Sequence, residues 1–474
     1  MQRAAAFRNA APVPPPCDPG SSGEAREGDS SMHQVRSRFG ELRPPLKGPD
    51  EAAFEAERCL FCGDTYAKAP CTVACPADID VPGFIRAIAE GNRNQAADII
   101  FAENPVGGSC ARVCPTQELC EGACVLNHDG ERPVSIARLQ RYATDSRLVQ
   151  GRPLDTQKAA GSAKVAVIGA GPSGLACASV LTGLGLQVTV FDARAAVGGL
   201  VRYAIAPYRL WASPLDEEAQ QLIARGVEFQ LGRSIDGPDA LRALESEYEA
   251  IYLGVGLGED TMLDLPGKDL AGVQAALPWI EALKAGMMPP LGERVAVIGG
   301  GNTAIDVARE ALRLGAREVT MLYRRTQAEM PAYGFEVEEA REEGVRFLWL
   351  IIPIGYVGKG HVEGVTCRYA RLSEADVSGR RRPEEIQGTD FVFPCDTVIT
   401  ALGQNPRQEF LGWIPGLEVK GGRIVVDEET GQTGNPKYYA GGDAVNGGAT
   451  AVEAVREAKR AALAIARRLE EVRA

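Results

Sequence analysis

The fold of most of this 474-residue chain can be inferred from one stretch, KVAVIGAGPSGLACASVLTGLGLQVTVFDA, residues 164–193. A short apolar run of strand length leads through a Gly-x-Gly-x-x-Gly turn into a helical stretch and then a second apolar run. Gly169 and Gly171 allow the backbone to turn tightly and approach a pyrophosphate, and Gly174 allows helix and strand to pack closely. Asp192 follows in the position that accepts hydrogen bonds from ribose hydroxyls. The stretch predicts a parallel α/β fold that binds a dinucleotide.

The same plan recurs in RVAVIGGGNTAIDVAREALRLGAREVTMLYRRT, residues 294–326. The residues expected at this second nucleotide loop are Gly299, Gly301, Asn302 and Thr303. Here the second strand ends in Arg324 and Arg325 instead of an acid, and two cations favour the 2′-phosphate of NADP. The alternative is that both arginines are only solvated at an exposed strand end, so NADH remains possible.

Two further stretches resemble the FAD motifs of flavoproteins that bind two dinucleotides. They are AAVGGLVRY, residues 195–203, and YYAGGDAVNGGATAVEAVREAKRAALAI, residues 438–465. The resemblance implies that Asp443 contacts the ribityl chain and that the helix beginning near Ala451 points its amides at the flavin ring. The FAD-binding residues implied in this way are Gly199, Gly442, Asp443 and Ala451. Because this signature is split along the chain, the nicotinamide fold is expected to be inserted within the FAD fold.

Eight of the twelve cysteines fall between Cys59 and Cys124. Cys59 begins a Cys-x2-Cys pair, and Cys71 begins a Cys-x3-Cys pair followed by proline, an ending also found in ferredoxin cluster motifs. A stretch with helical spacing of apolar residues, 81–105, separates these pairs from the later cysteines. We therefore expect a small α-helical domain with iron–sulfur clusters, with zinc binding and unligated cysteines as the alternatives.

The strings GGSCARVCPTQELCEGACVLN, residues 107–127, and VSIARLQRYATD, residues 134–145, closely resemble the N-terminal iron–sulfur domain of dihydropyrimidine dehydrogenase. They are similar to the flavoprotein subunits of bacterial dihydropyrimidine dehydrogenase, glutamate synthase and NADH-dependent ferredoxin:NADP oxidoreductase. The resemblance implies two 4Fe-4S clusters with interleaved ligands. One implied set is Cys59, Cys62, Cys71 and Cys124, and the other is Cys75, Cys114, Cys120 and the non-cysteine ligand Gln140. Cys110 is then left as a small buried apolar residue.

Composition excludes several other classes of function. A net charge of -12 disfavours nucleic acid as a partner, and no apolar run approaches the roughly 18 residues that cross a bilayer. The first 45 residues are rich in proline, alanine, glycine and serine, which predicts a disordered leader, with a transit peptide as a weaker alternative. Without a secretory signal before the cysteines, we expect a reducing, cytoplasmic compartment.

The expected architecture is an N-terminal α-helical iron–sulfur domain followed by two α/β dinucleotide-binding domains of the Rossmann-like, glutathione-reductase type. The stretch VITALGQNP, residues 398–406, resembles the strand by which such chains return to the FAD domain. The expected segments are a leader at 1–45, an iron–sulfur domain at 46–150, FAD-binding parts at 158–290 and 398–474, and an NAD(P)H-binding domain at 291–397.

Three details of the α/β part are also predicted. Arg209, in AIAPYRLW, is expected to be structural. The charge-rich segments 309–318 and 336–347 are expected to be helices with solvated faces. The three histidines stand apart without metal-ligand spacing, and none is assigned to catalysis.

These features predict the electron-input subunit of a hetero-oligomeric oxidoreductase. Hydride from NADPH would pass to FAD, and single electrons would pass through two 4Fe-4S clusters to a partner, so the cofactors and not side chains would carry the chemistry. A dihydropyrimidine dehydrogenase catalytic subunit is the favoured partner, because Gln140 stands where that branch has glutamine. The alternatives are a glutamate synthase large subunit and a partner linked to ferredoxin, 2-oxoacids or aldehydes. A non-catalytic assembly protein that binds clusters and nucleotides represents a different class.

Overall fold

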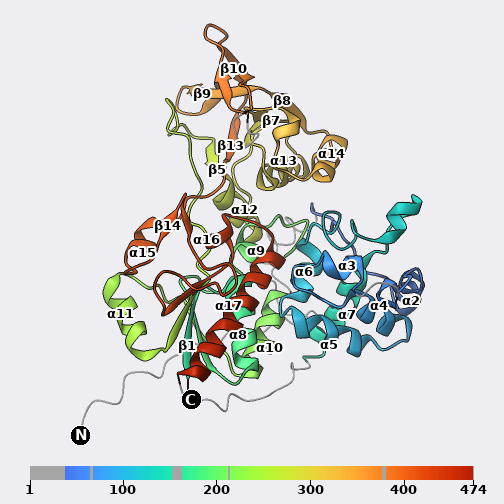
Figure 1. Cartoon of the computed structure of the whole chain (residues 1–474). Coiled ribbons are helices and arrows are strands. Elements are labelled where there is room, and N and C mark those ends of the chain that lie inside the picture. Colours follow the sequence, from blue (N-terminus) through green and yellow to red (C-terminus); the bar gives the residue numbers. More distant parts are fainter. Residues whose placement is uncertain (1–37, 65–67, 152–162, 212–213, 376–380, 473–474) are drawn as a thin grey trace, which may run out of the picture.

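The computed structural model describes residues 38–64, 68–151, 163–211, 214–375 and 381–472. They form a helical block at the N-terminus and two α/β units (Figure 1). Each α/β unit is built on a five-stranded parallel sheet. Within the described ranges, no helix combines the length and the apolar character needed to cross a membrane.

The helical block confirms the predicted α domain. Its helices are α2 (Pro49–Glu57), α3 (Pro70–Val73), α4 (Val81–Ala89), α5 (Arg93–Glu103), α6 (Gly107–Val113) and α7 (Ile136–Val149). The stretch 81–105 forms two helices, not one, because Gly91 has a φ of 76° and Asn92 starts α5 as a cap. The Asn92 side chain accepts a hydrogen bond from the backbone N–H of Gln95.

The first α/β unit has the strand order β16-β4-β1-β2-β3, with every pair parallel. Its strands are β1 (Lys164–Ile168), β2 (Gln187–Asp192), β3 (Glu228–Leu231), β4 (Ala250–Leu253) and β16 (Tyr438–Ala440). Its helices are α8 (Pro172–Gly183), α9 (Gly199–Tyr203), α10 (Leu215–Arg225), α11 (Pro238–Glu247), α15 (Gln408–Gly412), α16 (Asp443–Asn446) and α17 (Ala451–Glu471). A two-stranded ribbon, β14 (Val419–Lys420) with β15 (Arg423–Ile424), precedes the return to the sheet.

The second α/β unit lies between β4 and β16 in the chain, which confirms the insertion. Its parallel sheet has the order β5-β13-β6-β7-β8. The strands are β5 (Val273–Ala275), β6 (Arg294–Gly299), β7 (Glu318–Tyr323), β8 (Arg346–Trp349) and β13 (Thr397–Ala401), with helices α12 (Ala276–Lys284), α13 (Asn302–Leu314) and α14 (Gly334–Glu342). Antiparallel strands β9 (Ile351–Gly358), β10 (Val362–Leu372), β11 (Pro383–Glu385) and β12 (Phe391–Pro394) form its outer end.

The boundaries of the second unit differ from those predicted. Residues 398–406 were expected to begin the return to the FAD domain, but β13 pairs with β6 and β5 inside the second sheet. Every residue of β13 is buried, and a parallel strand of this kind requires a neighbour on each side. The second unit therefore includes 273–284 and 397–401 as well as most of the segment between them.

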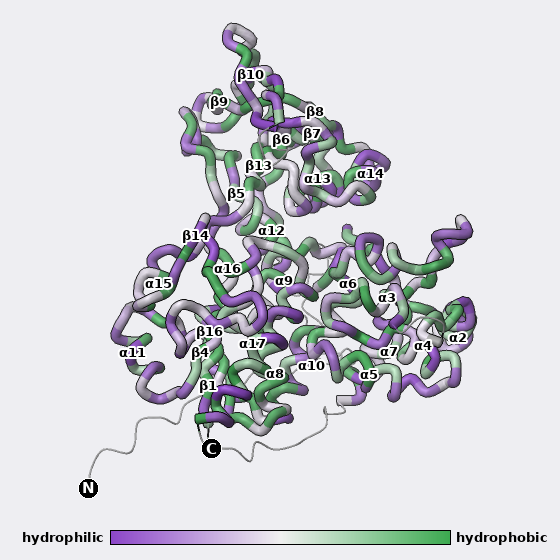
Figure 2. Tube along the Cα trace, viewed as in Figure 1, coloured by the Kyte–Doolittle hydropathy of each residue, from purple (hydrophilic) through white to green (hydrophobic). Residues whose placement is uncertain are grey.

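One hydrophobic core joins the helical block to the first α/β unit. Phe84 and Ile100 from the block belong to the same buried cluster as Val165, Leu175 and Ile465. Figure 2 shows hydrophobic residues along α8 and β1, and hydrophilic ones on the outer helix α14. The helical block and the first α/β unit are therefore packed as one body, which fixes the cysteines relative to the first nucleotide fold.

The structure describes only the last part of the predicted leader. Residues 1–37 lie outside the described residues, but residues 38–45 are placed, and Phe39 is buried in the core of the second α/β unit. The expectation of disorder is therefore wrong for 38–45. The reason is that the aromatic side chain of Phe39 packs in an apolar core formed by residues that are distant in sequence.

The charge-rich helices are also less solvated than expected. Arg309 and Glu336 are buried, although both belong to segments predicted to have solvated faces. Arg309 donates hydrogen bonds to Glu339 and Glu343. Arg209 forms an ion pair with Glu336 at 2.8 Å, in agreement with its expected structural role.

Candidate functional site

The first glycine loop has the backbone geometry that its sequence implies. Gly169 has a φ of 107°, and a Cβ at this position would lie 2.2 Å from the carbonyl oxygen of Gly254. A Cβ at Gly174 would lie 1.8 Å from the carbonyl oxygen of Gly169. Gly171 caps α8 without a side-chain hydrogen bond, so the first N–H groups of the helix stay open to an anion.

Three segments distant in sequence meet at this helix N-terminus. A Cβ at Gly199 would lie 3.0 Å from the Cα of Gly171, and one at Gly442 would lie 3.0 Å from the Cβ of Ser173. The structure therefore brings the predicted glycine pair and the predicted C-terminal motif against the first loop. Because the glycines have no side chains, the three segments can approach this closely and still leave space for a ligand.

The two carboxylates predicted at this site have different surroundings. Asp192 ends β2, and its carboxylate accepts hydrogen bonds from the N–H groups of Ala170 and Arg194, each at 2.7 Å. Burial raises the pKa of Asp443, which is the first residue of α16. Ala451 begins α17, directly after a capping box formed by Thr450.

The second glycine loop has an open side. A Cβ at Gly299 would lie 2.2 Å from the carbonyl oxygen of Ala401, whereas one at Gly301 would meet no atom within 4 Å. Asn302 begins α13, and its Oδ1 accepts a hydrogen bond from the N–H of Tyr333 at 3.0 Å. Thr303 is the next residue of that helix. The start of α13 is thus arranged like the start of α8.

Two cations follow the second strand of this unit. Arg324 is exposed directly after β7, and Arg325 is half-buried beside it. The Nε of Arg325 is buried and has no hydrogen-bond partner among the residues that the structure describes. The exposed guanidinium of Arg324 offers a planar set of donors at this strand end, which fits an anionic group such as a phosphate.

The cysteines line two separate cavities. The first cavity is lined by all four residues of the first implied ligand set, Cys59, Cys62, Cys71 and Cys124. Cys71 reaches it despite its distance from Cys62 in sequence, because α3 begins at Pro70 and places it there. Burial raises the pKa of Cys71 to about 12.

The second cavity is lined by the other implied set, Cys75, Cys114, Cys120 and Gln140. The Nε2 of Gln140 donates a hydrogen bond to the carbonyl oxygen of Gly107 at 2.7 Å. This bond uses the amide nitrogen of the side chain and leaves Oε1 as the donor atom for a metal.

Cys110 also lines the second cavity, which the sequence did not indicate. Its thiol is hydrogen-bonded to that of Cys114, and this bond and burial raise the pKa of Cys114. The spacing of Cys110 on α6, four residues before the cap residue Cys114, was the only available signal.

The chemistry of these donors fits polynuclear clusters. Burial raises the pKa of the Cys59, Cys71, Cys75 and Cys120 thiols, and the iron of a cluster would stabilise the thiolates, with one such ligand per iron. In the described ranges, no three histidine, cysteine, aspartate or glutamate side chains are grouped around a point that would suit a single ion. The donors surround two larger spaces instead.

The second cavity adjoins the first α/β unit. Val452, the second residue of α17, is part of its wall. The Nζ of Lys459, farther along the same helix, donates a hydrogen bond to the carbonyl oxygen of Ala77 at 2.8 Å. Among the residues that the structure describes, none from the α/β units lines the first cavity, which includes Leu60, a residue that is 62% exposed.

Two family models match this chain. One, described as dihydropyrimidine dehydrogenase domain II, 4Fe-4S cluster, covers residues 36–152. The other, described as pyridine nucleotide-disulphide oxidoreductase, covers residues 163–458. Together they span the helical block and both α/β units.

Similar proteins carry names from the same group of enzymes. The chain is 38% identical to a glutamate synthase (NADPH) small chain of Halomonas elongata, over 91% of this chain and 94% of that protein. It is 37% identical to the beta subunit of an NADP-dependent formate dehydrogenase of Moorella thermoacetica, over 89% of this chain and 63% of that protein.

A solved structure, FprA of Mycobacterium tuberculosis in complex with NADPH, has a similar fold. Its TM-score is 0.56 at 20% identity, over 66% of this chain and 85% of that chain. The chain belongs to the pyridine nucleotide-disulphide oxidoreductase family, in the group of NAD(P)H-dependent FAD and iron–sulfur oxidoreductases that includes the glutamate synthase small chains.

Proposed function

We propose that this chain is the electron-input subunit of a hetero-oligomeric oxidoreductase, which oxidises NADPH and delivers electrons to a separate catalytic subunit. The single observation that carries the proposal is the position of the second cavity. It touches the start of α17 at Val452, where the predicted FAD motif lies. A cluster there would be the nearer of the two to the flavin.

The residues of the first α/β unit would hold FAD. The open N–H groups at the start of α8 suit the pyrophosphate, and Asp192 is oriented by two backbone N–H groups beside the ribose position. Gly199 and Gly442 pack against the loop and keep its surface free of side chains. We assign Asp443 and the N-terminus of α17, at Ala451, to the flavin side.

The residues of the second unit would hold and orient NADPH. Gly301 leaves the surface above α13 open, and Asn302 and Thr303 begin the helix. Arg324 and Arg325 would bind the 2′-phosphate. When bound, FAD supplies a two-electron acceptor for the hydride and the clusters supply one-electron carriers. The protein contributes alignment and the exclusion of water.

The donor sets of the two cavities would hold one cluster each. Cys71 and Cys75 are on the same turn of chain but belong to different cavities, so this turn connects the two sites. The exposed Leu60 marks the first cavity as the one nearer the surface. We therefore infer that electrons leave from the first cavity, and that the physiological partner docks on this side.

For the partner, we propose a glutamate synthase large chain. Two glutamate synthase small chains match along almost their whole length, 94% of the Halomonas elongata protein and 92% of the Escherichia coli protein. This support comes from the related proteins, and it changes the ranking of the candidate partners. From the sequence, Gln140 had favoured a dihydropyrimidine dehydrogenase partner. That pyrimidine partner stays a prediction, as does a cytoplasmic location.

Reconstitution tests this proposal. The purified chain, loaded with FAD and iron–sulfur clusters, is mixed with a glutamate synthase large chain, and NADPH oxidation and glutamate formation are followed. We expect oxidation that depends on the large chain. If NADPH reduces the flavin but only a formate dehydrogenase or pyrimidine-reducing subunit accelerates turnover, the general function holds and the glutamate synthase assignment fails.

A further inference from the structure

Residues 38–47, called the tie below, connect three parts of the molecule ahead of the first helix. Residues 38–45 of the tie were expected to be disordered, and no site described above uses the tie. One end of the tie lies on the second α/β unit, and the other lies on the helical block. Arg38, at the start of the tie, contacts Leu314, which lies 276 residues later in the sequence.

The first end of the tie is built into the nicotinamide unit. Phe39 is 5% exposed and belongs to the same core cluster as Trp279 and Leu283 of α12. Arg38 donates a hydrogen bond from Nη1 to the carbonyl oxygen of Leu314, the last residue of α13, at 2.9 Å. A buried aromatic ring and a helix-end hydrogen bond hold this end in place.

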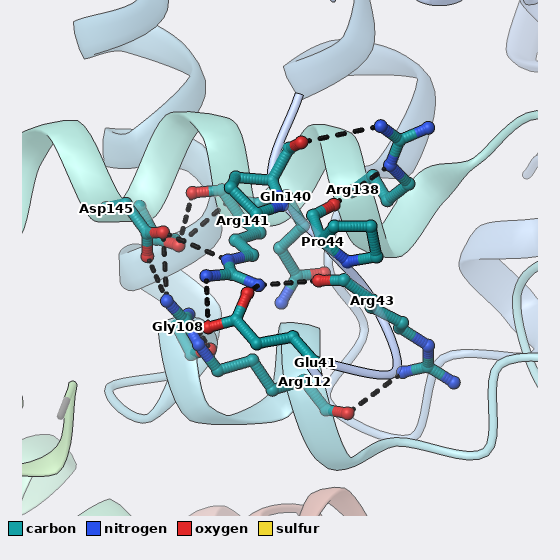
Figure 3. A network of polar contacts seen from close by, with 11 residues as sticks. Glu41, Arg43, Pro44, Gly108, Arg112, Arg138, Gln140, Arg141 and Asp145 are labelled. Carbon is teal, nitrogen blue, oxygen red and sulfur yellow. Dashed lines mark hydrogen bonds and ion pairs between the residues drawn. The ribbon is translucent and has the colours of Figure 1, made fainter. Parts of the chain in front are cut away.

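The other end is held by arginines of the helical block (Figure 3). Arg141 of α7 is 7% exposed, and it donates hydrogen bonds to the Glu41 carboxylate at 2.8 Å and to the carbonyl oxygen of Arg43 at 2.5 Å. Arg138, one turn earlier, donates to the carbonyl oxygen of Pro44 at 3.1 Å. Arg141 directly follows Gln140, so the tie is attached to the helix that carries this cavity residue.

The middle of the tie contacts the segment between α9 and α10 of the first α/β unit. The backbone N–H of Leu42 donates to the carbonyl oxygen of Tyr208 at 2.8 Å. The hydroxyl of buried Tyr208 donates to Asp306 of α13, and the guanidinium of Arg313 lies 4.1 Å from the centre of its ring. The tie is thereby linked to α13 a second time, through Tyr208.

We propose that the tie is a positioning element for hydride transfer: it attaches the nicotinamide unit to the helical block and so fixes this unit relative to the flavin. The chain enters and leaves the nicotinamide unit only through the segments after β4 and after β13. The tie adds a further non-covalent attachment, beside the ion pairs that Arg209 of the first unit forms with Asp306 and Glu336 of the second. An attachment of this kind restricts rotation of the unit, and small misalignments of reacting atoms reduce rates strongly.

The test is anaerobic stopped-flow mixing of the holoprotein with NADPH, following flavin bleaching. For Phe39→Ala we expect the limiting rate of bleaching at saturating NADPH to fall about ten-fold or more, with FAD and iron content unchanged. The dissociation constant for NADPH should change much less, because none of the residues assigned to the nucleotide belongs to the core cluster that contains Phe39. Phe39→Leu should restore most of the rate.

A second variant tests the tie without creating a cavity in the hydrophobic core. Glu41→Gln removes the charge that pairs with Arg141 at the partly exposed end of the tie, and it should lower the same limiting rate to a smaller extent. Phe54→Ala, which truncates an exposed phenylalanine of α2, is the matched control and should leave the rate unchanged. Wild-type limiting rates in both tie variants, with intact cofactors, would overturn the proposal.

The proposal rests on the proposed function, but the two fail in different ways. If NADPH does not bleach the flavin of the wild-type protein, the proposed function fails. If it bleaches the wild type and both tie variants equally fast, only the role of the tie fails.

Discussion

Gln140 illustrates how one hydrogen bond can set the role of a side chain. Its amide nitrogen is bound to the carbonyl oxygen of Gly107, so the remaining amide oxygen is the atom available to the second cavity. Gly107 also begins α6, the helix on which Cys110 lies and at whose end Cys114 is the cap residue. The position of the glutamine and that of the cysteines thus depend on the same short helix.

Replacing Cys114 should remove the cluster of the second cavity. We expect Cys114→Ala to lose about half of the iron and to keep FAD, because its thiol belongs to only one of the two donor sets. Iron and flavin contents of the purified protein are the measurement. Cys110→Ala is the control from the same cavity and should keep its iron; full iron in Cys114→Ala would contradict the ligand assignment.

The arginines after β7 should select between the two nicotinamide cofactors. We expect Arg324→Ala combined with Arg325→Ala to weaken binding of NADPH about ten-fold or more and to affect NADH little, since only NADPH has the 2′-phosphate. Binding titrations with both nucleotides measure this difference. Arg317→Ala, at an exposed ion pair on the same unit, is the control. Equal losses for both nucleotides would show that the pair does not bind the 2′-phosphate.

At the residue scale, the family resemblance implied different ligand sets for Cys71 and Cys75. The two residues line different cavities, and their role as ligands stays a prediction. Sequence reasoning did not anticipate Cys110 beside Cys114, nor the burial of Arg309 and Glu336. Those positions depend on which distant elements pack together, and a charge pattern along one helix does not contain that information.

At the scale of single elements, the glycines of the nucleotide loops serve different purposes. Gly174 is required by the fold itself, because a Cβ there would overlap the carbonyl oxygen of Gly169. Gly301 has open space where its Cβ would be. Gly174 preserves the strand-to-helix turn, and Gly301 leaves room for a nucleotide.

This difference gives opposite outcomes for two identical substitutions. Gly174→Ala should lower the unfolding temperature and the FAD content, because a Cβ 1.8 Å from backbone oxygen forces α8 away from β1. Gly301→Ala should fold normally and bind NADPH more weakly. Thermal unfolding, flavin content and NADPH titration separate the cases. A fully stable, FAD-loaded Gly174→Ala protein would show that the loop tolerates a side chain.

The elements themselves were largely predictable, and their boundaries were less so. The strand, turn and helix of both loops follow from apolar runs and glycines, and the structure confirms their order. The strand β13 was assigned to the wrong unit because its apolar sequence fits a buried position in either sheet. Only the pairing with β6 decides between them.

At the scale of the whole molecule, a buried carboxylate joins the helical block to the first α/β unit. Glu218 of α10 is 1% exposed, and its carboxylate accepts hydrogen bonds from the N–H of Ser109 at 2.9 Å and from its hydroxyl at 2.5 Å. Burial raises its pKa to about 8. The interface between the two parts is therefore expected to depend on pH.

The sign of this dependence follows from the raised pKa of Glu218. In the folded state the carboxyl binds a proton more tightly than in the unfolded state, so its contribution to stability is present below about pH 4.5 and lost as the pH rises toward 8. Wild-type unfolding temperature should therefore fall more between pH 5 and 8 than that of Glu218→Gln. The surface variant Glu342→Gln is the control. Parallel pH profiles for the wild type and Glu218→Gln would contradict this expectation.

The arrangement of the three parts could be predicted only in outline. The insertion of one nucleotide fold in the other follows from the split FAD motif, and the structure confirms it. The continuous core between helical block and first unit, and the tie to the second, do not follow from any motif. They arise from packing between segments far apart in the chain, such as Phe39 with α12.

The central claim is that electrons from NADPH reach the flavin first and pass through the second cavity to the first. Anaerobic stopped-flow mixing with NADPH, following flavin and cluster absorbance in the wild type and in Cys114→Ala, tests it most directly. We predict rapid flavin bleaching in both proteins, followed by cluster bleaching in the wild type that is lost or strongly slowed in Cys114→Ala. An unbleached flavin, or cluster bleaching in Cys114→Ala at the wild-type rate, would contradict it.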